Sequence, residues 1–443
     1  MIKVLKSDLY SVAFNTESLD LYPFPARVGD SLLRDEVSAS RHLPKGFEAD
    51  QTKDSPAKIT RLSLLITQTC NIECSYCIAQ TYMGSHSDNR IMSPATAFAA
   101  IEKVFQSVPD VPSIVFLGGE PLIGFATIKA AVQASEKYCM AHQAPMPAFA
   151  ITTNGTLIDK EATDFFKRHH FSVTISLDGP QHIHDKQRKF PSGKGTYDIV
   201  KENIDRLRNA GVKVAIEAVF TDIHRKCKET IESTYEFLLQ LGPREICLTP
   251  AIGGSPDECL DGKFLADLEQ SYTSSTEKIM DSWLTDSPIK VSYWLDILHT
   301  FLSREGKTHF CDAGYEGITV DCSGKVYPCH ALMSNSLCMG SVYDQEFPGG
   351  DFRRVTVLMR QTSKDSFPKC FECWAKKLCS PCYGDTFAAG GTLSAPRESI
   401  CIIIRSVAKG ILLKVAEFMM DEEKWKRFIE NVNRSLEASI RVT

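Results

Sequence analysis

A regular alternation of two sequence patterns fills the middle of this chain and restricts its fold more than any other feature. From residue 61 onward, each apolar run of strand length is followed by a segment whose apolar residues recur at three- and four-residue spacing, as in an amphipathic helix. The strand-like runs are 62–67, 114–117, 149–152, 173–177, 214–220 and 246–249, and the helical patterns are 94–107, 125–142, 160–169, 197–210, 227–241 and 262–284. Strands that alternate with helices form a parallel sheet covered by those helices. Six units are too few for a closed eight-stranded barrel, which leaves a partial barrel or an open doubly wound sheet.

The segments on either side of this alternation have a different character. Residues 1–60 are rich in turn formers, and we expect a small N-terminal extension with two strands there. Beyond residue 300 the sequence predicts a strand–turn–strand at 318–327, cysteine-rich loops, and helices from about 402 to 438. We therefore expect an extension over 1–60, an α/β part over 61–300 and a second domain over 301–443.

Overall charge and hydropathy exclude several classes of protein. The 443 residues carry a formal net charge of −5, which provides no basic surface for nucleic acid or for anionic membranes. No run of about eighteen apolar residues is present, and Asp8 interrupts the start of the chain before the apolar core of a signal peptide can form. We therefore predict a cytoplasmic protein without nucleic-acid or membrane partners, whose 16 cysteines are not expected to form disulfides.

Most of these cysteines gather in two groups. Cys70, Cys74 and Cys77 follow directly on the first predicted strand, and nine more lie from Cys311 to Cys401. Thiolates favour zinc or iron–sulfur clusters as partners. Structural zinc requires four protein ligands, whereas a [4Fe–4S] cluster held by three cysteines leaves one iron free for an outside ligand.

The pattern CxxxCxxC at residues 70–77, with Tyr76 before its last cysteine, resembles the signature of the radical S-adenosylmethionine (SAM) superfamily. Three further motifs fall at the ends of the next predicted strands in the order expected of that superfamily: Gly-Gly-Glu-Pro at 118–121, Thr-Asn-Gly at 153–155 and Ser-Leu-Asp-Gly-Pro at 176–180. The resemblance covers about residues 61–290 and implies a partial (β/α)6 TIM-like barrel. The contacts with SAM that it implies come from Tyr76, Gly118, Gly119, Glu120, Pro121, Asn154, Ser176, Asp178 and Arg188.

The chemistry that this resemblance implies belongs to the bound cofactors. Cys70, Cys74 and Cys77 would hold a [4Fe–4S] cluster whose free iron is chelated by SAM, and an electron donor such as ferredoxin or flavodoxin would reduce that cluster. Cleavage of SAM would yield methionine and a 5′-deoxyadenosyl radical, which takes a hydrogen atom from the substrate. The protein would bind and orient these groups and exclude solvent and oxygen.

The C-terminal cysteines have a spacing of their own. The pattern C-x2-C-x5-C-x2-C over 370–382 could by itself be a zinc knuckle, although five residues between the pairs are few. The whole pattern from 311 to 401 resembles the SPASM extension of radical SAM enzymes, which houses two auxiliary [4Fe–4S] clusters; here the last spacing is two residues where three is usual. The resemblance implies three clusters in all, with one auxiliary cluster on Cys311, Cys329 and Cys382, for which Cys322 is the tentative fourth ligand, and the other on Cys370, Cys373, Cys379 and Cys401. If neither Cys322 nor the next candidate, Cys338, reaches the first of these clusters, one of its irons is open to substrate sulfur.

The resemblance implies a maturase, and it makes a ribosomally made peptide or a protein side chain the expected substrate. Auxiliary clusters suggest a net oxidation, and a thioether or carbon–carbon crosslink within a precursor peptide fits best. Because the 60 residues before the barrel are few for a complete peptide-recognition domain, a separate recognition protein is expected. The alternatives are a formylglycine-forming sulfatase maturase, a small-molecule dehydrogenase and a non-enzymatic zinc scaffold. In the sulfatase-maturating relatives an aspartate, taken to be the base, follows the cysteine that matches Cys329; here that residue is His330, a candidate proton acceptor.

Overall fold

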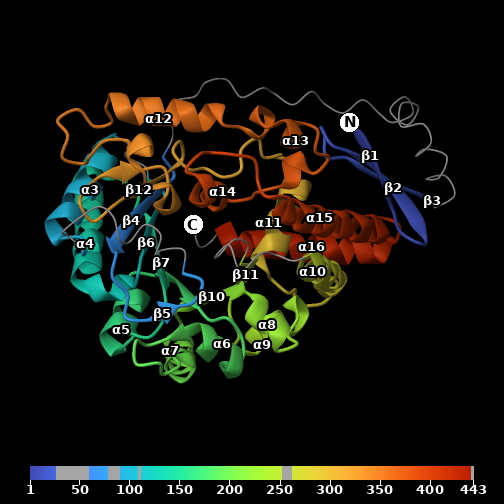
Figure 1. The fold of residues 1–443 in the computed structure, drawn as a ribbon, viewed down its shortest axis with the longest axis horizontal. Helices are drawn as coiled ribbons and strands as arrows, with labels where there is room; N and C mark the ends of the chain where they lie inside the picture. Colours follow the sequence, from blue (N-terminus) through green and yellow to red (C-terminus); the bar gives the residue numbers. More distant parts are fainter. Residues whose placement is uncertain (26–58, 78–89, 108–110, 252–261, 441–443) are drawn as a thin grey trace.

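A single mixed sheet forms the centre of the molecule. The computed structural model describes residues 1–25, 59–77, 90–107, 111–251 and 262–440. The sheet has the strand order β11-β10-β8-β7-β6-β4-β12-β13, and every neighbouring pair is parallel except β12 with β13 (Figure 1). The strands are β4 (Arg61–Thr67), β6 (Ser113–Gly118), β7 (Ala148–Thr153), β8 (Ser172–Ser176), β10 (Lys213–Phe220), β11 (Ile246–Pro250), β12 (Gly317–Val320) and β13 (Val326–Tyr327). The six strands predicted from the apolar runs are therefore confirmed.

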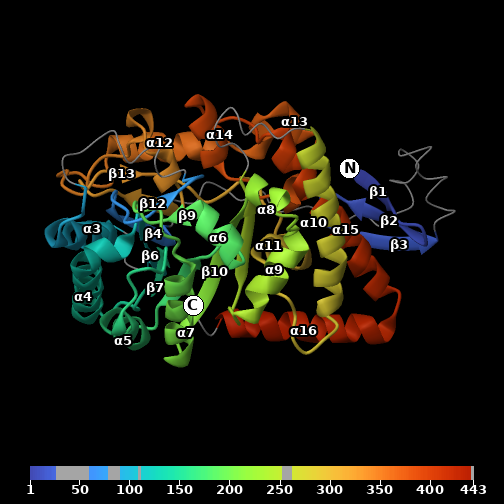
Figure 2. The ribbon, with the colours of Figure 1, turned by 60° about the horizontal axis from the view of Figure 1, so that its bottom comes forward.

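The strand order from β4 to β11 explains why the sheet has one covered face and one open face. Strands that are consecutive along this part of the chain are neighbours in the sheet, so right-handed crossovers place all their helices on the same side. Figures 1 and 2 show these helices outside the strands. They are α3 (Pro94–Ser107), α4 (Phe125–His142), α5 (Lys160–Arg168), α7 (Tyr197–Asn209), α8 (Asp222–Lys226), α9 (Ile231–Gln240) and α10 (Gly262–Ser282). The partial barrel is thereby confirmed and the doubly wound alternative is not.

The burial pattern of β10 identifies the open face. Val214, Ile216 and Ala218 are buried, whereas Glu217 and Val219 between them are only partly buried. Since successive side chains of a strand point to opposite faces, the first set packs under the helices and the second faces the interior of the barrel.

Local capping decides where the helices begin. The Asp159 carboxylate accepts a hydrogen bond from Ala162 N at 2.8 Å and starts α5. The helix predicted over 227–241 is wrong in its first residues: Lys228 has a positive φ of 64°, and Thr230 caps a new helix, α9, by accepting from Ser233 N at 3.0 Å. Two short helices in this region, α6 (Gln181–Gln187) and α8, were not predicted.

The cysteine-rich segment continues the barrel sheet. β12 pairs parallel with β4, with Ile318 opposite Leu62, and Arg61 Nη2 lies 2.7 Å from Asp312 Oδ1. The predicted strand–turn–strand is confirmed as β12 and β13, and the predicted C-terminal helices as α15 and α16. The helices beyond α10 are α11 (Ser292–Ser303), α12 (Gly350–Gln361), α13 (Pro368–Phe371), α14 (Tyr383–Gly390), α15 (Glu398–Met419) and α16 (Glu422–Ile440).

A separate antiparallel sheet at the N-terminus packs on α15. It contains β1 (Ile2–Lys6), β2 (Tyr10–Asn15) and β3 (Leu21–Pro25), one strand more than predicted. Tyr10 donates its hydroxyl to Leu413 O at 2.6 Å, which joins β2 to α15. Gly410 lets α15 lie against α10, because a Cβ there would stand 2.8 Å from Thr276 Cγ2. None of the helices in the described ranges is long and apolar enough to cross a bilayer.

Candidate functional site

The strand-end motifs meet at the carboxyl edge of the barrel. The segment with the first three cysteines leaves β4 and forms a two-residue strand, β5 (Glu73–Cys74), that pairs antiparallel with β9 (Arg188–Lys189). Cys74 stands opposite Arg188 in this pair, and Ser75 N donates to Gln187 O at 3.0 Å. The cysteine segment is thus fastened to the chain that follows β8.

The three thiols lie close to one another beside polar donors. Cys70, Cys74 and Cys77 act electrostatically on one another, Asn154 Nδ2 lies 3.6 Å from Cys70 Sγ, and Arg188 Nη1 lies 3.8 Å from Cys74 Sγ. Burial raises the pKa of Cys70, and it raises the pKa of Cys74 to about 12 although Arg188 acts in the opposite direction. The raised pKa values of Cys70 and Cys74 favour neutral thiols, and metal coordination deprotonates a thiol. Three adjacent thiols with cationic and amide donors at their sulfurs fit an anionic iron–sulfur cluster with one iron free.

Two glycines allow the chain after β6 to pass directly against the cysteine segment. A Cβ on Gly119 would lie 2.2 Å from Thr69 O and 3.1 Å from Cys70 N, and one on Gly118 would lie 2.3 Å from Thr67 O. Gly118 also has a φ of 150°, a conformation that favours glycine. The glycines that the resemblance assigns to SAM binding are therefore also required for packing of the backbone at residues 67–70.

Glu120 links the ends of two neighbouring strands. Its carboxylate is fully buried and accepts hydrogen bonds from Leu122 N at 3.0 Å, Thr153 Oγ1 at 2.8 Å and Asn154 N at 2.8 Å. Burial raises the pKa of Glu120 to about 7 although all three donors favour the ionised form. Pro121 follows as the first residue of a 3-10 turn over Pro121–Gly124.

A buried ion pair organises the other side of the site. Arg188 donates from Nε to Asp178 Oδ2 at 3.0 Å and from Nη2 to Oδ1 at 3.2 Å, and Tyr76 donates its hydroxyl to Asp178 Oδ2 at 2.6 Å. Val219 N on β10 also donates to Asp178 Oδ1, at 3.1 Å. Burial opposes the charge on Asp178, but Arg188 and the hydrogen bonds outweigh it and lower the pKa of that carboxyl. Asp178 thus holds Arg188 and Tyr76 in place with both carboxylate oxygens.

Glu217 is a site residue that the sequence interpretation missed. It lies on β10 facing the barrel interior, between Ser176 on β8 and Cys247 on β11 in the sheet register. Burial raises the pKa of Glu217, while Arg188 and His330 act on it in the opposite direction. The sequence did contain a sign of this role, because Glu217 is an acidic residue in the middle of the otherwise apolar run 214–220. Alternate side chains of a strand point to opposite faces, so Glu217 points away from the helices.

Cys311, Cys329 and Cys382 form a second group near the mouth of the barrel. Each of these thiols acts electrostatically on at least one of the others, and His330 Nδ1 lies 3.6 Å from Cys329 Sγ. Burial opposes the thiolate at Cys329, but His330 outweighs burial and lowers the pKa of Cys329. Burial likewise opposes a charge on His330, but Cys329 and then Glu217 outweigh it and raise the pKa of the imidazole.

The structure does not bring the tentative fourth ligand to this group. The buried Cys322 thiol donates instead to Leu65 O at 3.2 Å and lies 3.7 Å from Arg90 O, behind the first barrel strand. Cys338 Sγ lies 3.7 Å from Gly340 O. Cys259, whose loop follows β11, lies outside the described residues.

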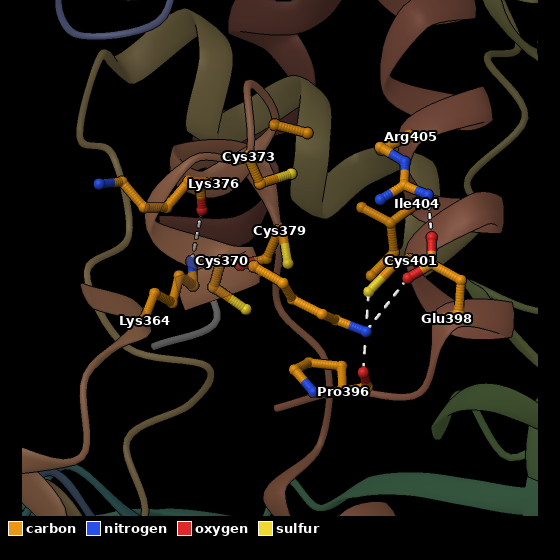
Figure 3. Close-up of a pocket in the computed structure, with 12 residues that line it drawn as sticks. Lys364, Cys370, Cys373, Lys376, Cys379, Pro396, Glu398, Cys401, Ile404 and Arg405 are labelled. Atoms are coloured by element: carbon orange, nitrogen blue, oxygen red, sulfur yellow. Dashed lines mark hydrogen bonds and ion pairs between the residues drawn. The ribbon is translucent and has the colours of Figure 1, made fainter. Parts of the chain in front are cut away.

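Cys370, Cys373, Cys379 and Cys401 line one cavity of about 70 Å³ (Figure 3). Cys370 lies on α13 and Cys401 on the first turn of α15, so segments about thirty residues apart meet here. In the described ranges, no three His, Cys, Asp or Glu side chains converge on a point as a single metal ion requires. Thiols placed around a cavity suit a cluster in which each iron takes one thiolate. The cavity is also lined by four basic residues: Lys364, Lys369, Lys376 and Arg405.

Comparison with known proteins agrees with this geometry. Residues 64–238 match the model of the Radical SAM superfamily. The chain is 25% identical over 332 residues to a cysteine-type anaerobic sulfatase-maturating enzyme of Clostridium novyi, covering 72% of this chain and 86% of the relative. It is 26% identical over 301 residues to a serine-type anaerobic sulfatase-maturating enzyme of Bacteroides thetaiotaomicron, covering 62% and 70%.

Two solved structures share the fold. Native anSMEcpe with bound AdoMet superposes with a TM-score of 0.65 at 19% identity, covering 86% of this chain and 100% of that one. Streptococcus suis SuiB bound to the precursor peptide SuiA superposes with a TM-score of 0.52 at 15% identity, covering 90% and 100%. The matched superfamily uses a [4Fe–4S] cluster and SAM, and the further cysteine groups described above fit additional clusters. Residues 64–238 of this chain are therefore a domain of the Radical SAM superfamily.

Proposed function

We propose that this enzyme oxidises a side chain of a ribosomally made peptide or of a protein and joins it to a cysteine of the same substrate as a thioether. The observation that carries this proposal is the group of Cys311, Cys329 and Cys382, which no fourth cysteine joins among the described residues. A [4Fe–4S] cluster on three thiolates keeps one iron open, and a substrate thiolate is the soft ligand that this iron favours. On this proposal residues 301–443 are a SPASM domain with two auxiliary clusters, after an extension over 1–60 and a barrel over 61–300.

Each group of residues has a separate task in this proposal. When bound at Cys70, Cys74 and Cys77, the cluster and SAM supply the radical that removes a hydrogen atom from the substrate. Arg188, which Asp178 holds in place, would orient the carboxylate of SAM. The backbone at 118–119, which has no side chains, would approach the amino group of SAM. Tyr76, Glu120, Pro121, Asn154 and Ser176 complete the predicted SAM contacts.

His330 is the proposed proton acceptor. Its Nδ1 lies beside Cys329 Sγ, and Glu217 favours the charged form of its ring. The imidazole therefore lies between the group of Cys311, Cys329 and Cys382 and the interior of the barrel. A substrate cysteine that enters this group must lose its thiol proton, and His330 would take it. Glu217 would then stabilise the imidazolium from the barrel wall.

Formylglycine formation is the second candidate. The similarity to cysteine-type and serine-type sulfatase-maturating enzymes favours it. In that case the cysteine or serine of a sulfatase-type peptide is oxidised to an aldehyde, and no crosslink forms.

The two candidates differ in their products. Reconstituted enzyme should be incubated anaerobically with SAM, a flavodoxin reducing system, and either a precursor peptide encoded beside this gene or cysteine- and serine-type sulfatase peptides. Mass spectrometry should show a precursor peptide that has lost two hydrogens and whose cysteine no longer reacts with iodoacetamide. An aldehyde that a hydrazide captures on the sulfatase peptide, with the precursor unchanged, would establish formylglycine formation instead. A separate recognition protein should be added in a parallel reaction.

A substitution at His330 tests its role. His330→Gln should lose at least about tenfold in peptide product while it still forms 5′-deoxyadenosine, because SAM cleavage does not need this proton acceptor. The matched control is His182→Gln, whose ring is 54% exposed on α6 and lies 3.5 Å from Glu229. Equal product from His330→Gln and the control would exclude His330 as the acceptor.

A further inference from the structure

The cavity of the four cysteines contains a lysine in an unusual environment. Lys364 is 1% exposed, and its ammonium donates to three backbone carbonyl oxygens: Lys307 O at 2.8 Å, Lys376 O at 2.7 Å and Cys379 O at 2.5 Å. Figure 3 shows its side chain reaching toward Lys376 O beside the sulfurs. Lysine is almost never fully buried unless a charge compensates it, because removing an ammonium from water is costly.

The other basic residues around this cavity have carboxylate partners. Lys369 and Arg405 share Glu398, at 3.2 and 2.5 Å, and Lys376 lies 2.6 Å from Asp365. The acceptors of Lys364, by contrast, are neutral carbonyls. Carbonyl dipoles hold an ammonium in position but do not cancel its charge.

The cavity therefore presents positive charge to whatever it holds. A [4Fe–4S] cluster with four thiolate ligands is anionic, and it gains a further negative charge when it accepts an electron. A fixed cation nearby makes that gain more favourable, and net charge near a cluster is one of the factors that set its reduction potential.

We propose that Lys364 is a positioning and charge-compensating residue for a cluster on Cys370, Cys373, Cys379 and Cys401. Its ammonium raises the reduction potential of this cluster, so that the cluster can accept the electron that the substrate radical loses when the thioether forms. The inference rests on the ligand set of the proposed function. It adds the residue that makes this cluster an electron acceptor.

A purely structural role would have a different signature. By bridging three carbonyls, Lys364 also fastens the chain at residues 307, 376 and 379. Arginine keeps the charge and the donors at this position, and glutamine keeps donors without the charge. Comparing Lys364→Arg with Lys364→Gln therefore distinguishes the effect of the positive charge from the effect of the hydrogen bonds that hold the chain together.

The experiment measures potentials rather than product. In a background carrying Cys70→Ala, Cys74→Ala and Cys77→Ala, which removes the SAM-site cluster, each variant is reconstituted and analysed for iron, sulfide and melting temperature. Its auxiliary clusters are then titrated by reduction under electron paramagnetic resonance. A parallel Cys373→Ala sample identifies the signal of this cavity. The matched control is Lys409→Gln, because Lys409 is an exposed lysine on α15, the helix that carries Cys401, and does not line this cavity.

Lys364→Gln should keep its iron and become about tenfold harder to reduce, which is about 59 mV for a one-electron couple. Lys364→Arg should restore the potential, and Lys409→Gln should leave it unchanged. Loss of this iron in Lys364→Gln but not in Lys364→Arg also supports charge compensation. Equal potentials in Lys364→Gln and the parent overturn the proposal, and so does equal loss of iron in both Lys364 variants.

The results distinguish a failure of the proposed crosslinking function from a failure of the role proposed for Lys364. If no crosslinked peptide forms but the potential depends on the charge at residue 364, the substrate assignment is wrong and the present inference stands. If the parent protein holds no iron on these four cysteines, the inference itself is wrong.

Discussion

At the scale of single residues, the site is organised by buried polar side chains whose partners come from other strands. Asp178 is the centre of this arrangement, because Arg188, Tyr76 and Val219 N all donate to its carboxylate. Two histidines fix the backbone around it: Asp178 N lies 3.3 Å from His184 Nδ1, and His224 Nε2 lies 2.7 Å from Asp178 O. Such contacts stabilise the site only while each ring keeps the protonation state that they require.

The protonation of His184 should make stability depend on pH. Burial lowers the pKa of His184 from 6.5 to about 4 although Asp178 acts in the opposite direction. The unfolded chain therefore takes up this proton first as the pH falls, so the contribution to stability is complete above about pH 6.5 and is lost as the pH falls toward 4. Lowering the pH from 7.5 to 5 should therefore reduce the free energy of unfolding by about 2 kcal/mol through this group.

The measurement is urea unfolding of the anaerobic protein at both pH values. His184→Gln, which accepts a hydrogen bond without titrating, should reduce the loss of stability on acidification by that amount. His182→Gln is the exposed control on the same helix. An unchanged pH dependence in His184→Gln would show that this ring is not the responsible group.

At the scale of elements, the decisive contact is between the segment after β4 and the segment after β6. Gly118 and Gly119 bring these backbones together, with Gly119 N donating to Thr67 O at 2.8 Å and Glu120 N donating to Thr69 O at 2.9 Å. These bonds position the start of the cysteine segment at the carboxyl edge of the sheet. The same edge receives β9, so the cysteines are held from two sides.

A methyl group at residue 119 should displace the cysteine segment. Gly119→Ala places its Cβ 2.2 Å from Thr69 O, and a backbone atom cannot move aside as a side chain can. We expect a destabilisation of about 1–3 kcal/mol and at least a tenfold slower formation of 5′-deoxyadenosine, measured by chromatography. Gly350→Ala is the matched control, since a Cβ there has no neighbour within 4 Å. Normal SAM cleavage by Gly119→Ala would contradict the close packing.

At the scale of the whole molecule, the barrel and the cysteine-rich segment share a sheet. β12 extends the barrel sheet beyond β4, and Figure 1 shows α12, α13 and α14 lying along one side of the barrel strands. The boundary near residue 300 was predicted where the alternation of strand and helix patterns ends. The segments on its two sides nevertheless contribute strands to one hydrogen-bonded sheet. We expect both parts to unfold together.

Calorimetry can test this coupling. Ile318 on β12 is 1% exposed, so Ile318→Ala should cost about 2–5 kcal/mol. One unfolding transition should move as a whole to lower temperature. Val357→Ala on α12, where the side chain is 50% exposed, should leave it in place. Two transitions, of which only one moves in Ile318→Ala, would show that the two parts unfold independently.

Patterns within the sequence were sufficient to predict most of the helices and strands of the barrel. The bounds predicted for α3 and α4 agree with the structure to the residue, and the six barrel strands were found. These features depend on periodicity and capping, which act within a few residues of the chain. The four cysteines that the resemblance assigns to one auxiliary cluster line one cavity near α13, and the cluster itself stays a prediction.

The surroundings of the individual side chains could not be predicted in this way, because they depend on the packing of the folded chain. This packing placed Cys322 behind β4, turned the carboxylate of Asp178 toward Arg188, put Glu217 on the barrel wall, and buried Lys364 among carbonyls beside the sulfurs. Each of these outcomes depends on contacts between segments that are distant in the chain. Side-chain burial and charge pairing arise only when those segments pack, so no local pattern contains them.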